Sequence, residues 1–64
     1  MELGTKFRFI KTFFFMHSIA GAEDLLGYEF ELTRKSPDFD YCTNTKGEMY
    51  LLNTDQFQTK IELI

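Results

Sequence analysis

The chain is 64 residues long, which is enough for one small domain and leaves no room for a second. Hydrophobic residues make up 44% of the chain and aromatic residues 17%, a composition typical of a packed core rather than of a disordered segment. Ten acidic and seven basic residues give a formal net charge of −3, which argues against a basic nucleic-acid binder. A single cysteine excludes a disulfide scaffold.

The first predicted element is a strand from Thr5 to Met16. Its early positions alternate between apolar and basic side chains, namely Phe7 and Phe9 against Lys6 and Arg8, which predicts one buried and one exposed face. Both faces then become apolar at Phe13–Phe15. Either a bulge near Lys11 changes the inward face, or both faces are covered at this point.

Basic residues ahead of a short apolar stretch also resemble the start of a secretory signal peptide. The apolar stretch, Phe13–Met16, is short, and His17 and Ser18 interrupt it. No segment approaches the ~20 apolar residues of a membrane-spanning helix. We therefore expect no signal peptide and no membrane association, a cytoplasmic location, and a reduced Cys42.

A long connection runs from His17 to Gly27, and one or two helical turns are predicted within it, from Ala20 to Leu26. The next strand, Tyr28–Thr33, is the clearest of all, because apolar and polar residues alternate throughout it. Its exposed face carries Glu29 and Glu31, which we expect to pair with the basic residues of the first strand.

Turn residues at Ser36-Pro37-Asp38 end this strand. The third strand, Phe39–Thr43, is predicted to point Phe39 and Tyr41 inward. A tight hairpin at Asn44–Gly47 joins it to a fourth strand, Glu48–Leu52. Because this fourth strand is apolar on both faces, we predict that it lies in the middle of the sheet.

The polar segment from Asn53 to Phe57 predicts one helical turn, with Phe57 folded back as a plug. A last strand is predicted from Gln58 to Leu63. Five strands of this kind predict a mainly β fold that rolls into a small closed barrel. Its expected core consists of Phe7, Phe9, Tyr28, Phe30, Leu32, Phe39, Tyr41, Leu51, Phe57, Ile61 and Leu63.

This order, with a long first connection and a helical turn before the last strand, resembles the SH3-like barrel over nearly the whole chain. Peptide-binding members of that family carry an Ala-Leu-Tyr-Asp-Tyr stretch and paired tryptophans, and this chain has neither. The resemblance therefore implies the fold and not proline-rich ligand binding. The stretch Tyr41–Leu52, followed by Asp55-Gln56-Phe57, is also similar to a hairpin-plus-turn of short phage-encoded barrel proteins. That similarity implies a viral protein that acts on host machinery.

Residue types that carry chemistry are few. His17 and Cys42 are the only members of their kinds, and two ligands are too few for a zinc site. The stretch from Asp38 to Thr43 starts like a calcium loop, with Asp38 and Asp40 two residues apart, but it has Cys42 at the third ligand position. The four glycines are scattered, so no phosphate-binding loop is predicted. We expect no enzymatic activity, metal, cofactor or small-molecule substrate.

An apolar surplus lies at the start of the first long connection. The predicted core already fills a small barrel, so one or two of the large side chains at Phe14, Met16 and Ile19 should stay accessible. The alternative is a loop that covers them with Leu25 and Leu26 as a lid. The surplus favours a protein-binding surface formed by Phe13, Phe14, Met16 and Ile19, with acidic contributions from Glu29, Glu31, Asp38 and Asp40.

The sequence therefore predicts a small non-catalytic protein-binding module, for example a phage-encoded inhibitor of a host protein. In one variant the four acidic residues imitate nucleic-acid phosphates and occupy a basic site on the partner. A nucleic-acid accessory barrel is one alternative and would use Lys6, Arg8, Arg34 and Lys35. A homo-oligomeric structural component, joined through the edge of the first strand, is another.

Overall fold

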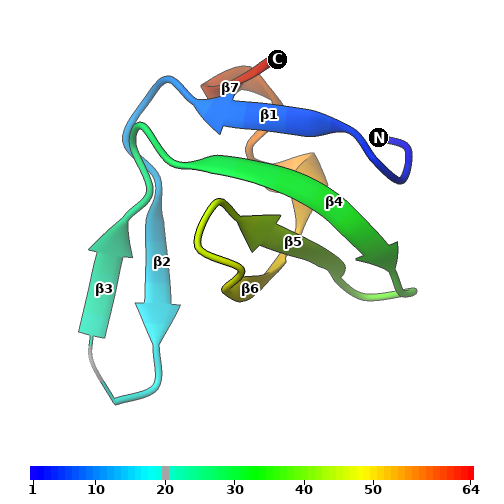
Figure 1. The fold of residues 1–64 in the computed structure, drawn as a ribbon. Helices are drawn as coiled ribbons and strands as arrows, with labels where there is room; N and C mark the ends of the chain where they lie inside the picture. Colours follow the sequence, from blue (N-terminus) through cyan, green and yellow to red (C-terminus); the bar gives the residue numbers. More distant parts are fainter. Residues whose placement is uncertain (20) are drawn as a thin grey trace.

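The protein is mainly β, with seven strands in two antiparallel sheets (Figure 1). A computed structural model describes residues 1–19 and 21–64. Five strands form the larger sheet and two form a separate hairpin. The elements are β1 (Lys6–Phe9), β2 (Phe14–His17), β3 (Gly21–Asp24), β4 (Glu29–Lys35), β5 (Asp40–Asn44), β6 (Met49–Leu52), the 3₁₀ turns η1 (Thr54–Gln56) and η2 (Gln58–Lys60), and β7 (Ile61–Leu63).

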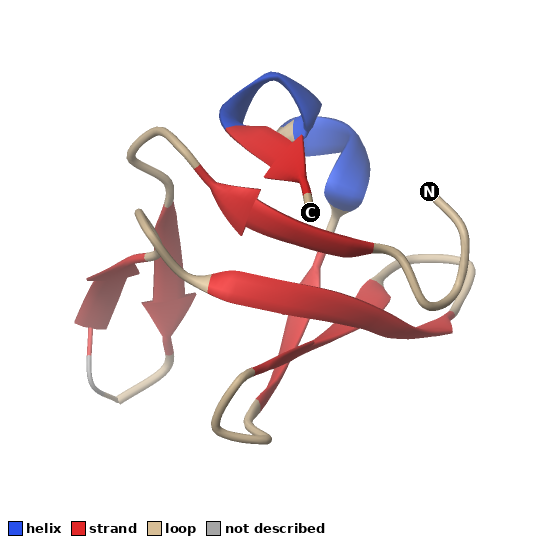
Figure 2. Ribbon diagram, turned by 45° about the horizontal axis from the view of Figure 1, so that its top comes forward, coloured by secondary structure: helices blue, strands red, loops and turns tan. Residues whose placement is uncertain are grey.

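The larger sheet has the strand order β6-β5-β4-β1-β7. A register shift between Leu32 and Arg34 marks a bulge in β4, and bulges bend a strand. In Figure 2, β5 runs obliquely from the end of β4, with which it pairs, and β6 passes behind β4 at a steep angle. The predicted closed barrel is not formed, because β6 and β7 end the sheet without pairing with each other in the part of the chain that the structure describes.

The core is built mainly from aromatic rings. Phe7, Phe9 and Phe57 are fully buried, and the Phe57 ring centroid lies 4.9 Å from that of Phe9. The predicted plug is therefore confirmed, and so is the helical turn that places it. Asn53 caps that turn, since its side chain accepts a hydrogen bond from the Asp55 N–H. The buried apolar residues are Phe7, Phe9, Leu25, Phe30, Leu32, Cys42, Tyr50, Leu52 and Phe57.

The third and fourth predicted strands exist, but the inward faces assigned to them are wrong. Phe39 lies just before β5 and is exposed, while Cys42 is fully buried. In β6, Tyr50 and Leu52 point inward and Leu51 is exposed. A run of consecutive apolar residues does not determine which face turns inward, because alternation supplies that signal.

Three further predictions about the strands are wrong. The fourth predicted strand, β6, lies at the edge of the sheet rather than in its middle. The last strand begins only at Ile61, since Gln58–Lys60 is a 3₁₀ turn, and Leu63 in that strand is exposed. The first predicted strand divides into β1 and β2, which belong to different sheets. Since β4 and β7 occupy both edges of β1, that strand has no free edge for pairing between chains.

The first long connection holds a strand in place of the predicted helical turns. Gly21–Asp24 pairs antiparallel with Phe14–His17, so that Phe15 faces Glu23. The part of the helical prediction that falls on Ala20 lies outside the described residues. Gly27 has a φ of +86°, so it turns the chain after this hairpin rather than ending a helix.

Candidate functional site

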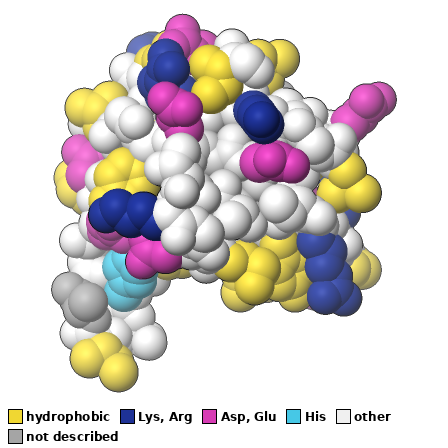
Figure 3. Space-filling model, viewed as in Figure 1, with side chains coloured by type: hydrophobic (Ala, Val, Ile, Leu, Met, Phe, Trp, Pro, Cys, Tyr) yellow, Lys and Arg dark blue, Asp and Glu magenta, His cyan; other side chains and the backbone are white. Residues whose placement is uncertain are grey.

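The hairpin formed by β2 and β3 presents a row of large apolar side chains to solvent. Phe14 is 60% exposed, Met16 is 70% exposed and Ile19 is 98% exposed. We call these three residues the hairpin strip. Figure 3 shows hydrophobic atoms at the tip of the hairpin, well away from the main body. The sequence predicted one or two accessible residues here, and the structure leaves all three accessible.

Phe13 does not belong to the hairpin strip. Its ring stacks on Phe9 with centroids 5.3 Å apart and lies 5.2 Å from the ring of Phe57, so it packs against the core. The alternative, a loop that covers these side chains with Leu25 and Leu26, is not formed either. Leu25 is fully buried and Leu26 is half exposed, so neither covers the outward side chains of β2.

The opposite face of the hairpin is held against the large sheet. Phe15 points inward and meets the ring of Tyr50 edge-on, with centroids 5.0 Å apart. At the base of the hairpin the main-chain N–H of Leu25 donates to the carbonyl of Phe13 at 2.8 Å. The Asp24 carboxylate accepts hydrogen bonds from the N–H groups of Phe13 and Leu26. The turn into β4 is therefore fixed by one main-chain hydrogen bond and by the Asp24 carboxylate.

The polar contacts on the inward face of the hairpin are made to one carboxylate, that of Glu23. Glu23 accepts hydrogen bonds from the Tyr28 hydroxyl at 2.5 Å and from the Tyr50 hydroxyl at 2.8 Å. His17 Nε2 lies 2.6 Å from the same carboxylate. We call these four residues, His17, Glu23, Tyr28 and Tyr50, the Glu23 knot. It ties β2 and β3 to β6 and to the chain segment that enters β4.

The hydrogen bonds of the Glu23 knot shift the pKa values of Glu23, Tyr28 and Tyr50. Hydrogen bonds from Tyr28, His17 and Tyr50 lower the pKa of the Glu23 carboxyl to about 2. Hydrogen bonding to Glu23 raises the pKa of Tyr28, and burial followed by the same hydrogen bond raises that of Tyr50. At neutral pH the carboxylate is therefore charged and both hydroxyls keep their protons. Both tyrosine hydroxyls can therefore donate to the charged carboxylate, which makes these two hydrogen bonds stronger than those between neutral groups.

A cleft of about 420 Å³ opens beside the Glu23 knot. The hairpin forms one wall and the turn between β5 and β6 forms the other, so that Lys46 and Glu48 face His17 and Glu23 across it. Figure 3 shows the histidine beside acidic side chains at this position. The sequence did not predict this group, because its four residues come from β2, β3, β6 and the segment that enters β4.

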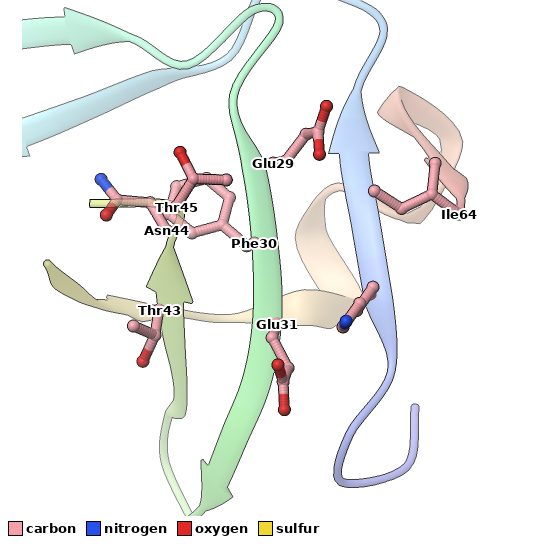
Figure 4. A pocket seen from close by; sticks show the side chains of 8 residues that line it. Glu29, Phe30, Glu31, Thr43, Asn44, Thr45 and Ile64 are labelled. Carbon is pink, nitrogen blue, oxygen red and sulfur yellow. The ribbon is translucent and has the colours of Figure 1, made fainter. Parts of the chain in front are cut away.

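Glu29 and Glu31 lie on the outer face of β4, beside a shallow pocket of about 210 Å³ (Figure 4). The predicted cross-strand pairing is confirmed for Glu29, whose carboxylate lies 3.1 Å from the Arg8 guanidinium. Arg8 also contacts Glu62 of β7 at 2.8 Å. Both carboxylates raise the pKa of the Arg8 guanidinium, and the hydrogen bond that Arg8 donates to Glu29 is the largest cause. Glu29 is therefore already committed to an internal ion pair.

Asp38 and Asp40 lie elsewhere, around a polar depression of about 230 Å³ at the turn between β4 and β5. Asp38 is exposed, whereas Asp40 accepts a hydrogen bond from the Thr54 hydroxyl at 2.6 Å. The structure therefore places the four predicted acidic residues around two separate depressions. They do not line a common pocket.

Cys42 and His17 lie in different surroundings, because Cys42 is part of the core whereas His17 contacts Glu23. The Cys42 thiol is buried, and burial together with the charge of Asp40 raises its pKa to about 12. Within residues 1–19 and 21–64, no group of three or more histidine, cysteine, aspartate or glutamate side chains is arranged to hold a metal ion. In the same residues, neither 3₁₀ turn has the length and apolar character that crossing a membrane requires.

A scan against protein-family models, a search of curated proteins and a search of solved structures found no match to this chain.

Proposed function

We propose that this chain is a small non-catalytic module that binds another protein through the hairpin strip. The observation that carries the proposal is the exposure of Phe14, Met16 and Ile19 on a hairpin whose other face is anchored. A patch of large apolar side chains in water is unfavourable unless a partner covers it. The partner we expect is a protein with an apolar surface that receives these three side chains.

The anchoring of the hairpin supports this function. A flexible loop would lose conformational entropy when it bound, and that loss weakens binding. Here the Glu23 knot and the Phe15–Tyr50 contact hold the hairpin before any partner arrives. The apolar side chains are thus offered in a fixed arrangement.

We further propose that the fold is an open variant of the SH3-like barrel. The strand order β6-β5-β4-β1-β7, the bulged β4 and the 3₁₀ turn before the last strand support this assignment. The hairpin then occupies the long first connection of that fold. Action on a host protein during phage infection stays a prediction about the identity of the partner.

The basic residues support nucleic-acid binding less well than the hairpin supports protein binding. Arg8 is held between Glu29 and Glu62, and Lys6 lies opposite Glu31 in the register of β1 and β4. A phosphate would have to compete with these carboxylates for Arg8. Phosphate mimicry by the acidic residues is weakened in the same way, because Arg8 neutralises Glu29.

The test compares two substitutions at positions that are equally exposed. Met16 in the hairpin strip and Leu63 in β7 are each 70% exposed, so Met16→Asp and Leu63→Asp change charge and apolar area alike. Immobilised parent and variants are incubated with extract of the native cell, and retained proteins are quantified by mass spectrometry. We expect a partner that the parent and Leu63→Asp retain and that Met16→Asp loses. Equal retention by all three proteins, or no specific retention by the parent, contradicts the proposal.

A further inference from the structure

The hairpin of β2 and β3 is attached to the rest of the fold more loosely than the strands of the large sheet are attached to one another (Figure 1). In the part of the chain that the structure describes, neither β2 nor β3 pairs with the large sheet, and neither contains a buried residue. The large sheet, by contrast, encloses the rings of Phe7, Phe9 and Phe57. A two-stranded hairpin by itself is only marginally stable in water. The order of this hairpin therefore depends on the side chains that hold it against the sheet.

Two hydrogen bonds and a small group of aromatic contacts connect the inward face of the hairpin with the rest of the fold. The hydroxyls of Tyr28 and Tyr50, which both lie outside the hairpin, donate to the carboxylate of Glu23. The rings of Phe15 and His17 contact the ring of Tyr50, with centroids 5.0 Å and 5.9 Å away. Both hydrogen bonds end on one carboxylate, so a single ionisable group controls them.

The strength of this connection depends on whether Glu23 is ionised. A carboxylate accepts hydrogen bonds on both oxygens, and bonds to a charged acceptor are roughly twice as strong as bonds between neutral groups. A protonated carboxyl carries a hydrogen on one oxygen, and here the hydroxyls of Tyr28 and Tyr50 together with His17 Nε2 already occupy both oxygens. Protonation therefore weakens the two tyrosine bonds. The His17 contact lies within the hairpin and does not join it to the sheet.

The other charged groups that face Glu23 lie across the cleft, on the turn between β5 and β6. Lys46 and Glu48 line this opposite wall. Glu48 accepts a hydrogen bond from the Asn44 side chain at 3.0 Å, which lies within the turn. In residues 1–19 and 21–64, neither Lys46 nor Glu48 forms an ion pair or a side-chain hydrogen bond with the hairpin. Glu23 is therefore the charged group that holds the hairpin.

We propose that proton uptake by Glu23 releases the β2–β3 hairpin from the Tyr28 and Tyr50 hydroxyls and unfolds it, while the five-stranded sheet stays folded. Proteins commonly open in such separate units, at a lower free energy than global unfolding. The three hydrogen bonds from Tyr28, His17 and Tyr50 lower the pKa of the Glu23 carboxyl from its ordinary 4.5 to about 2. The connection is therefore complete above pH 4.5 and is lost as the pH falls from that value toward 2.

The release of the hairpin also has a consequence for binding. The hairpin strip lies on the same two strands and on the turn between them, so acid would withdraw this surface together with the hairpin. This consequence rests on the proposed function, whereas the release of the hairpin itself does not depend on any partner.

Amide hydrogen exchange distinguishes the hairpin from the large sheet. The Leu25 N–H donates to the Phe13 carbonyl, and hydrogen-bonded pairs alternate along an antiparallel ladder, so the N–H groups of Phe15 and His17 lie between β2 and β3. These two amides report on the hairpin. The Leu32 N–H, which donates to the chain segment before β1 at 2.9 Å, reports on the large sheet.

The test compares the parent, Glu23→Gln and Glu48→Gln at pH 7, where the other ionisable groups keep their usual charges. Glu23→Gln replaces one acceptor oxygen by an NH₂ group, which then faces a donor. We expect the Phe15 and His17 amides of this variant to exchange about tenfold faster or more, with Leu32 unchanged. Glu48→Gln removes the same charge from the opposite wall of the cleft and should change none of the three rates.

A pH titration of the parent supplies the second measurement. As the pH falls from 4.5 toward 2, the nuclear Overhauser contact between the rings of Phe15 and Tyr50 should disappear, while that between Phe9 and Phe57 persists. Simultaneous loss of both ring contacts overturns the proposal, and so does persistence of both.

The exchange rates can overturn the proposal as well. Exchange in Glu23→Gln that is unchanged, or that is accelerated equally in the hairpin and at Leu32, shows that the hairpin is not a separate unit held by Glu23. The same acceleration in Glu48→Gln would show that charge in the cleft, and not the contact with the tyrosines, holds the hairpin. These measurements use no partner, so their failure is distinguishable from failure of the capture test with Met16→Asp.

Discussion

Replacing Phe57 with alanine tests how strongly the aromatic plug holds the sheet together. Phe57 is fully buried, and its ring lies 4.9 Å from Phe9, 5.2 Å from Phe13 and 5.9 Å from Phe7. The change removes a complete buried ring, which costs roughly 3–5 kcal/mol where the surrounding residues cannot fill the cavity. The Phe7 and Phe9 rings belong to β1, which main-chain bonds hold between β4 and β7, so we expect a value in the upper part of that range.

That cost is large for a chain of this size. At 0.05–0.15 kcal/mol per residue, a 64-residue domain has a free energy of unfolding of roughly 3–10 kcal/mol. Phe57→Ala is therefore expected to leave the protein partly or wholly unfolded at 25 °C. Phe57→Leu keeps most of the buried volume and should lower stability by about 1–2 kcal/mol.

Urea unfolding followed by far-ultraviolet circular dichroism measures these differences. The matched control is Phe14→Ala, because Phe14 is 60% exposed and its removal should change stability by about 0.5 kcal/mol or less. A Phe57→Ala variant that loses less than about 1 kcal/mol would show that the core can collapse around the missing ring. The packing described for Phe57 would then be wrong.

Two further predictions concern ionisable groups. Glu23→Gln should lower stability at pH 7, because hydrogen bonds from Tyr28, His17 and Tyr50 lower the pKa of the Glu23 carboxyl from 4.5 to about 2 in the folded state. A lowered folded pKa contributes stability above the unfolded value, and this contribution is lost as the pH falls through the folded value. The difference between parent and variant in urea unfolding should therefore shrink between pH 5 and pH 2, and a difference that does not change with pH contradicts this prediction. Burial and the charge of Asp40 raise the pKa of the Cys42 thiol to about 12. We therefore expect this thiol to react with an aromatic disulfide reagent only after the protein is unfolded in urea. Rapid reaction of the native protein would contradict the burial of Cys42.

The sequence predicted those parts of the fold in which side chains alternate. Phe30 and Leu32 point inward, as the pattern in Tyr28–Thr33 indicated, and the hairpin around Gly47 forms with that residue at a φ of +82°. Glu29 pairs with Arg8 because alternation fixed which face each occupies. In each of these cases the signal is local.

The parts that could not be predicted depend on contacts between distant residues. Gly21–Asp24 contains nothing that marks a strand, and it becomes one because Phe14–His17 lies beside it. The edge position of β6 follows from the order of the whole sheet and not from its apolar composition. Consecutive apolar residues, as in Met49–Leu52, leave the inward face undetermined.

The same distinction between local patterns and contacts of distant residues applies to the candidate site. The exposure of Phe14, Met16 and Ile19 could be predicted from an excess of large apolar residues over core volume. The Glu23 knot could not, since Tyr50 comes from another part of the chain and approaches Glu23 only after folding. Phe15 faces Glu23 across the hairpin, and His17 lies two residues after Phe15 on the same strand. A prediction of this hairpin would therefore have placed His17 and Glu23 on one face.

The hairpin strip as a binding surface is tested most directly by the methyl resonances of the protein in its complex. Labelled methyl groups of Met16 and Ile19 report on the hairpin strip, and those of Leu63 report on an equally exposed residue outside it. When the captured partner is titrated in, we expect the Met16 and Ile19 signals to shift or broaden while the Leu63 signals stay in place. A saturated complex in which the Met16 and Ile19 methyl groups are unchanged would contradict the account.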